Sequence, residues 1–67
     1  MGREYDRAIA IAAALKATHD RLTAEINELI RQNKRFSAEA AEIANERSEV
    51  RLAWDRVLGR IRRMEAG

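Results

Sequence analysis

The chain has 67 residues, with no cysteine, no proline, one histidine and three aromatic side chains, and its formal net charge is only +2. A chain of this length forms at most one domain, and its composition excludes disulfides and argues against a structural metal site. We therefore expect residues 1–67 to form a single helical domain without a linker, stabilised by helix packing or by association with a second copy.

The first apolar segment, residues 8–15, is too short to cross a bilayer and ends at Lys16. Acidic Glu4 and Asp6 stand where a secretion signal would carry basic residues. The sequence therefore predicts a cytoplasmic protein with no membrane partner.

A hydrophobic side chain recurs at every seventh position along most of the chain. This row comprises Leu15, Leu22, Leu29, Phe36, Ile43, Val50, Val57 and Met64. Helices in coiled coils pack through such a repeat, so we assign the row to heptad position d. The corresponding a positions are His19, Ile26, Asn33, Ala40, Arg47, Trp54 and Ile61. Twelve of these fifteen positions are apolar, which predicts an all-α coiled-coil protein.

Because the heptad phase never slips, the first interpretation is one long helix over roughly residues 3–65 that self-associates as a dimer. An asparagine at a single a position, as at Asn33, fixes the register of parallel dimers. The predicted oligomer seam comprises Leu15, Leu22, Ile26, Leu29, Asn33, Phe36, Ile43, Val50, Trp54, Val57, Ile61 and Met64.

The alternative is a two-helix antiparallel hairpin with a turn near residues 32–37, which pairs with a second hairpin into a four-helix bundle. Asn33 can take the left-handed conformation that ends a helix. Ser37 can cap the next helix, with Phe36 and Ala41 as a hydrophobic staple. The sequence leaves the choice between one long helix and a hairpin open.

An antiparallel arrangement would bring the two ends of the chain together. Ile9, Ile11, Leu52 and Leu58 lie outside the a and d positions and cluster toward these ends. In a hairpin they would widen the core there. The same arrangement would pair small with large side chains, for example Ala12 with Val57.

No arrangement of residues typical of catalysis is present: the chain lacks a glycine-rich phosphate loop and the motifs of serine or zinc hydrolases. His19 is the only imidazole, and no metal-ligand or triad spacing surrounds it. We therefore expect a non-enzyme without a cofactor or small-molecule ligand, in which His19 lies at the edge of the seam.

The C-terminal half carries a candidate partner face. Trp54, Leu58 and Ile61 recur at helical spacing, and Leu52 lies outside the seam. Anchors spaced in this way dock helices into the grooves of other proteins. The sequence therefore favours a small self-associating protein that binds another protein, as an assembly, adaptor or inhibitory factor. A purely structural oligomerisation module is an alternative.

A second function class is suggested by charge, because residues 47–67 hold six arginines against three acidic side chains. Five of these arginines are candidate phosphate contacts: Arg51, Arg56, Arg60, Arg62 and Arg63. They predict a nucleic-acid-binding regulator as the alternative function. Acidic neighbours dilute the positive field, and no aromatic side chains are interleaved for base stacking, so protein binding remains the first expectation.

Overall fold

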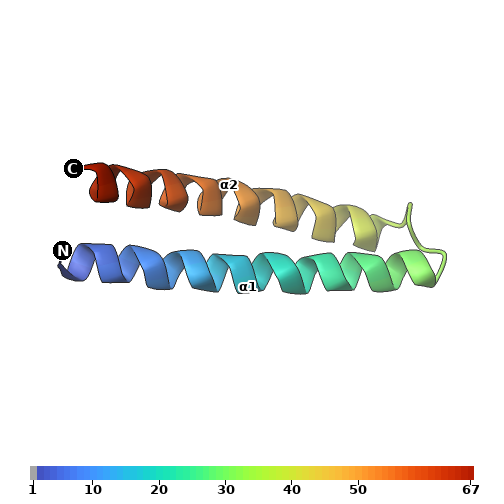
Figure 1. Cartoon of the computed structure of the whole chain (residues 1–67). Coiled ribbons are helices and arrows are strands. Elements are labelled where there is room, and N and C mark those ends of the chain that lie inside the picture. Colours follow the sequence, from blue (N-terminus) through green and yellow to red (C-terminus); the bar gives the residue numbers. More distant parts are fainter. Residues whose placement is uncertain (1) are drawn as a thin grey trace.

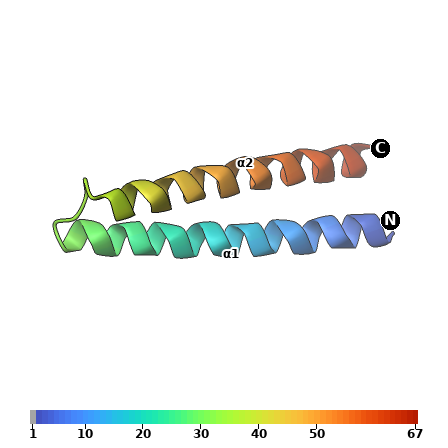
Figure 2. The ribbon, with the colours of Figure 1, turned by 180° about the vertical axis from the view of Figure 1, so that it is seen from behind.

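The chain folds into two antiparallel helices. The computed structural model describes residues 2–67. Helix α1 spans Arg3–Arg31 and helix α2 spans Ala38–Ala66. They lie side by side, with both chain ends at the same end of the molecule (Figures 1 and 2). The Cα atoms extend over 48 × 14 × 13 Å, so the hairpin is elongated and two helices thick.

The prediction of one continuous helix over residues 3–65 is wrong, because a turn at residues 32–37 reverses the chain. Asn33 adopts a left-handed backbone conformation with a φ of 60°. Its N–H donates to the carbonyl of Ile30 at 3.0 Å, and the N–H of Lys34 donates to the carbonyl of Leu29 at 2.8 Å. These two bonds form a Schellman motif, which ends α1. The two-helix antiparallel hairpin with a turn near residues 32–37 is confirmed.

Ser37 caps α2 as the sequence predicted. Its Oγ accepts a hydrogen bond from the N–H of Ala40 at 3.1 Å and donates one to the carbonyl of Lys34 at 2.8 Å. The same side chain therefore satisfies a free N–H of the helix and closes the turn. The expected staple between Phe36 and Ala41 is wrong, because Phe36 is 96% exposed.

The heptad positions form a seam inside one chain. Six side chains are buried: Ala8, Ala12, Leu22, Leu29, Ala40 and Ile61. Seven more of the predicted seam residues are half-buried beside them: Leu15, Ile26, Ile43, Val50, Trp54, Val57 and Met64. The predicted seam is therefore intramolecular. Asn33 and Phe36 lie in the turn and take no part in it.

The ends of the two helices are joined by packing and by a hydrogen bond. Ala8, Ala12 and Ile61 form a buried cluster, against which larger side chains of α2, including Val57, pack. Beyond this cluster the hydroxyl of Tyr5 donates to Oε2 of Glu65 at 2.7 Å. This hydrogen bond to a carboxylate is the main reason that the pKa of Tyr5 is raised above 10.0. The expected contact between small side chains of α1 and large ones of α2 is present here.

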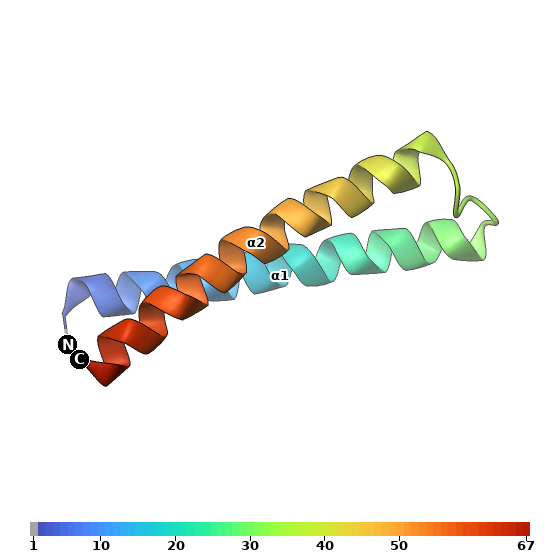
Figure 3. The same cartoon turned by 90° about the horizontal axis from the view of Figure 1, so that it is seen from above.

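Seen from above, α2 crosses over α1 instead of running straight beside it (Figure 3). Helices that pack through a heptad seam cross at a shallow angle, which keeps their apolar stripes in contact along the length. The seam thus divides the surface of the hairpin into two long flanks, one on each side of the line where the helices meet.

We predict that Asn33→Gly leaves the stability unchanged or slightly higher, because glycine adopts a positive φ without strain. Asn33→Val should lower the free energy of unfolding by about 1–2 kcal/mol, because a β-branched side chain is strained there. Urea unfolding followed by circular dichroism measures both changes, and Lys34→Val serves as the control within the same turn. Unchanged unfolding of Asn33→Val would show that this turn does not depend on the left-handed residue.

Candidate functional site

One flank of the seam carries two rows of side chains spaced by seven residues. The α1 row is Glu4, Ile11, Thr18 and Glu25, and the α2 row is Glu39, Glu46, Ala53 and Arg60. The rows share one side of the hairpin, because Ile11 and Arg60 line one hollow while Glu25 and Glu39 line another. We refer to this side as the Ile11/Ala53 face.

The two hollows give the Ile11/Ala53 face opposite charges at its two ends. The hollow near the chain termini is lined by two arginines and one glutamate: Arg7, Arg60 and Glu4. The hollow near the turn is lined by three glutamates and one lysine: Glu25, Glu28, Glu39 and Lys34. Between the two hollows the face carries the small side chains of Thr18 and Ala53 and the exposed carboxylate of Glu46, while the 42% exposed side chain of Ile11 belongs to the hollow near the chain termini.

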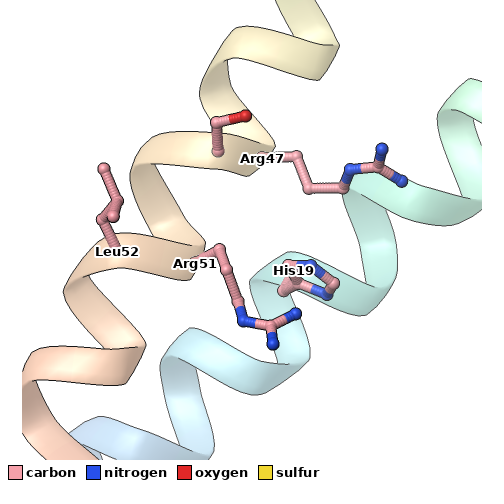
Figure 4. A pocket seen from close by; sticks show the side chains of 5 residues that line it. His19, Arg47, Arg51 and Leu52 are labelled. Carbon is pink, nitrogen blue, oxygen red and sulfur yellow. The ribbon is translucent and has the colours of Figure 1, made fainter.

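The opposite flank carries the rows Ile9, Lys16, Thr23 and Ile30 on α1 and Ala44, Arg51, Leu58 and Glu65 on α2. We refer to it as the Lys16/Arg51 face. Near its middle a hollow is lined by His19 of α1 together with Arg47, Ser48, Arg51 and Leu52 of α2 (Figure 4). The hollow therefore combines a histidine of α1 with two arginines and a serine of α2.

Trp54 holds part of this cluster in position. The guanidinium carbon of Arg51 lies 5.6 Å from the centroid of the Trp54 ring, a cation–π distance. The imidazole of His19 is tilted against the same ring, with centroids 6.0 Å apart. Nε of Arg51 also lies 3.4 Å from Oδ1 of Asp55. The indole ring of Trp54 thus restricts the movement of the Arg51 and His19 side chains.

Arg47 differs from Arg51 because its charge has no carboxylate partner within residues 2–67. It is half-buried at an a position, and its Nη1 donates a long hydrogen bond of 3.4 Å to Oγ1 of Thr23. Within residues 2–67 it forms no ion pair. The nearby carboxylate of Asp20 is bonded to Lys16 at 2.9 Å, which is the main reason that the pKa of Asp20 is lowered.

The structure separates the four residues of the candidate partner face. Ile61 is only 6% exposed, because it belongs to the buried cluster between the helices. Trp54 and Leu58 are half-buried against that cluster. Leu52 alone lies open, with 59% of its surface exposed. The predicted face therefore does not form a single exposed surface on this hairpin.

The five candidate phosphate contacts are all exposed but lie on different sides of α2. Arg51 belongs to the Lys16/Arg51 face, whereas Arg56, Arg60 and Arg63 point toward the other flank by helical spacing. The same spacing puts Arg62 away from those three. Sequence reasoning missed Arg7, which the antiparallel fold brings to the same hollow as Arg60. The signal that could have identified Arg7 is its heptad position, read in an antiparallel hairpin.

The turn carries Phe36, which the sequence analysis had assigned to the seam. Ile30, Asn33, Arg35 and Phe36 line a shallow hollow at the end of the hairpin. Phe36 projects there from a loop whose backbone is fixed by the Schellman motif and the Ser37 cap. An exposed aromatic side chain on an ordered turn is a candidate contact for another molecule.

No helix formed by residues 2–67 combines the length and apolarity needed to cross a membrane. In the same residues no three His, Cys, Asp or Glu side chains gather in a way that could hold a metal ion. Comparison with protein-family models, with curated proteins and with solved structures finds no match to this chain.

We predict that Arg47→Leu stabilises the protein by about 1 kcal/mol, because leucine buries apolar surface where a charge without an ion pair in residues 2–67 now lies. The free energy of unfolding in urea measures the effect, and the matched control is Arg56→Leu, at an exposed arginine that forms no ion pair within residues 2–67. A loss of stability in Arg47→Leu would mean that the contact with Thr23 outweighs the unpaired charge.

Proposed function

We propose that this protein is a helical hairpin that pairs with a second copy into a four-helix bundle and binds another protein, as an assembly or adaptor factor. The observation that supports this proposal is incomplete burial. Only six side chains are buried among residues 2–67, while Ile9, Ile11 and Leu52 are each more than 40% exposed. A core this small supplies at most a few kcal/mol of stability, and pairing of two hairpins would enlarge it.

The Ile11/Ala53 face suits contact with a second copy. Thr18 and Ala53, near the midpoints of the two helices, are small enough to let another pair of helices approach closely. Ile11 adds an exposed apolar side chain next to them. Charged side chains surround this centre, so the face has the apolar middle and polar rim of a protein interface.

The charges of this face favour an antiparallel dimer. In a two-fold symmetric pair the same patch meets itself, so each residue contact occurs twice. In the antiparallel pair, the two-fold axis lies in the interface and is perpendicular to the helices. It brings the basic end, with Arg7 and Arg60, onto the acidic end of the partner copy, with Glu25 and Glu28. A parallel pair would place like charges together, which costs free energy.

The turns of such a dimer would lie at opposite ends of the bundle. Each would expose Phe36 beside Lys34 and Arg35, with no acidic residue between positions 32 and 37. An aromatic anchor next to cations matches an apolar pocket rimmed by carboxylates on a partner protein. With two such turns, one bundle could hold two partner molecules, which is the basis for proposing an adaptor.

A charge-exchange experiment tests the dimer. Arg7→Glu/Arg60→Glu makes both ends of the face acidic, and Glu25→Lys/Glu28→Lys makes both basic, so we expect each variant alone to dimerise at least tenfold more weakly, about 1.4 kcal/mol. An equimolar mixture of the two should recover a dimer of wild-type affinity, because acidic ends then meet basic ends. Sedimentation equilibrium measures both effects.

The matched control is Arg62→Glu, an exposed reversal away from this face, which should leave the association constant unchanged. Wild-type protein that stays monomeric at high micromolar concentration would refute the self-association. Dimerisation of both variants without mixing would refute the choice of face.

The turn has its own test. We predict that Phe36→Ser changes neither the free energy of unfolding, within about 0.5 kcal/mol, nor the dimer constant, because the side chain contacts no core. Leu29→Ser, at a buried position, should cost several kcal/mol and serves as the comparison. Weaker dimerisation of Phe36→Ser would place the turn in the dimer interface and withdraw the proposed partner site.

Nucleic-acid binding remains the alternative function. The observation in its favour is that Arg7 joins Arg60 at the basic end of the Ile11/Ala53 face. Duplex DNA or structured RNA bound there would be released steeply as salt concentration rises.

A further inference from the structure

We propose that the hollow formed by His19, Arg47, Ser48 and Arg51 binds the phosphate group of a small ligand. This site lies on the Lys16/Arg51 face, away from the proposed dimer interface, so it does not depend on self-association. The sequence alone predicted no small-molecule ligand, because no motif surrounds His19. Only the hairpin brings His19 of α1 to the same hollow as Arg47 and Arg51 of α2.

Arg47 has unused hydrogen-bonding capacity. Its guanidinium is half-buried, forms no ion pair within residues 2–67 and donates only one long hydrogen bond. A partly buried charge without a counter-charge is unfavourable unless an anion reaches it. The remaining N–H groups of Arg47 can donate to such an anion in the forked geometry typical of arginine.

Arg47, Arg51 and His19 line the same hollow. Arg47 and Arg51 lie one turn apart on the same side of α2, so their guanidinium groups can reach one anion. In Figure 4 both side chains extend toward α1, the guanidinium of Arg47 over one turn of it and that of Arg51 over another, and His19 lines the same hollow. Trp54 restricts Arg51 and His19 before any ligand arrives, which lowers the entropic cost of binding.

Phosphate suits this set of donors better than a carboxylate does. Two guanidinium groups, the hydroxyl of Ser48 and an imidazole offer more donors than the two oxygens of a carboxylate can use, whereas a phosphate group has enough oxygens for them. Asp20 and Asp55 lie next to the donors on α1 and α2. Their charges disfavour an extended polyanion along the groove, so a discrete phosphate group fits better than a nucleic-acid backbone.

Titration with inorganic phosphate tests the site, with sodium chloride replaced so that ionic strength stays constant. Trp54 is the only tryptophan and lies against Arg51, so its fluorescence should change in a saturable way as phosphate binds. We expect Arg47→Gln to weaken phosphate binding by about tenfold or more and Ser48→Ala by a few fold. Isothermal titration calorimetry provides a second readout.

The matched control is Arg56→Gln, which removes an exposed arginine from the other side of α2 and should bind phosphate like the wild type. Circular dichroism of each variant verifies that the hairpin is folded, and Ser48→Ala, an exposed conservative change, keeps the test valid if Arg47→Gln is perturbed. A fluorescence change that chloride reproduces, or an equal loss in Arg56→Gln, would overturn the proposal. Duplex DNA that binds at this hollow more tightly than phosphate would overturn it in favour of a nucleic-acid site.

Discussion

The fold depends on how α1 ends. The left-handed conformation of Asn33 and the two hydrogen bonds of the Schellman motif stop the first helix, and Ser37 starts the second one a few residues later. This reversal turns a heptad pattern that could join two chains into a seam within a single chain. It also brings Arg7 close to Arg60 and His19 close to Arg51, so every surface discussed above is a consequence of this turn.

The helical class, most seam positions and the turn residues Asn33 and Ser37 could be predicted from sequence, because each rests on a local rule, whereas the predicted seam residues Asn33 and Phe36 lie in the turn. Heptad spacing identified Leu22, Leu29 and Ile61 as seam residues, and turn chemistry identified Asn33 and Ser37. The choice between one long helix and a hairpin could not be predicted in the same way. Seven residues separate Leu29 from Phe36 and Phe36 from Ile43, so the phase continues across the turn and looks like one helix.

The candidate sites were less predictable, because they combine residues from both helices. Arg7 carries no signal of its own until the register of the hairpin puts it beside Arg60. Ile61 has the spacing of a partner anchor, yet the folding of the chain buries it against Ala8 and Ala12. Spacing along one helix identifies a face of that helix. Which face remains open is decided by the other helix.

Arg47 is the position where the local rules conflict. Neighbouring a positions in α2 hold Ala40, Trp54 and Ile61, all of which pack in the seam, whereas Arg47 brings a charge that no carboxylate of residues 2–67 neutralises. An apolar residue there would serve folding better. A departure from an otherwise consistent pattern, at a position where other donors converge, indicates a functional constraint. The same charge that weakens the ligand-free seam would stabilise the hairpin once an anion is bound, which couples occupancy of the Lys16/Arg51 face to the packing of the two helices.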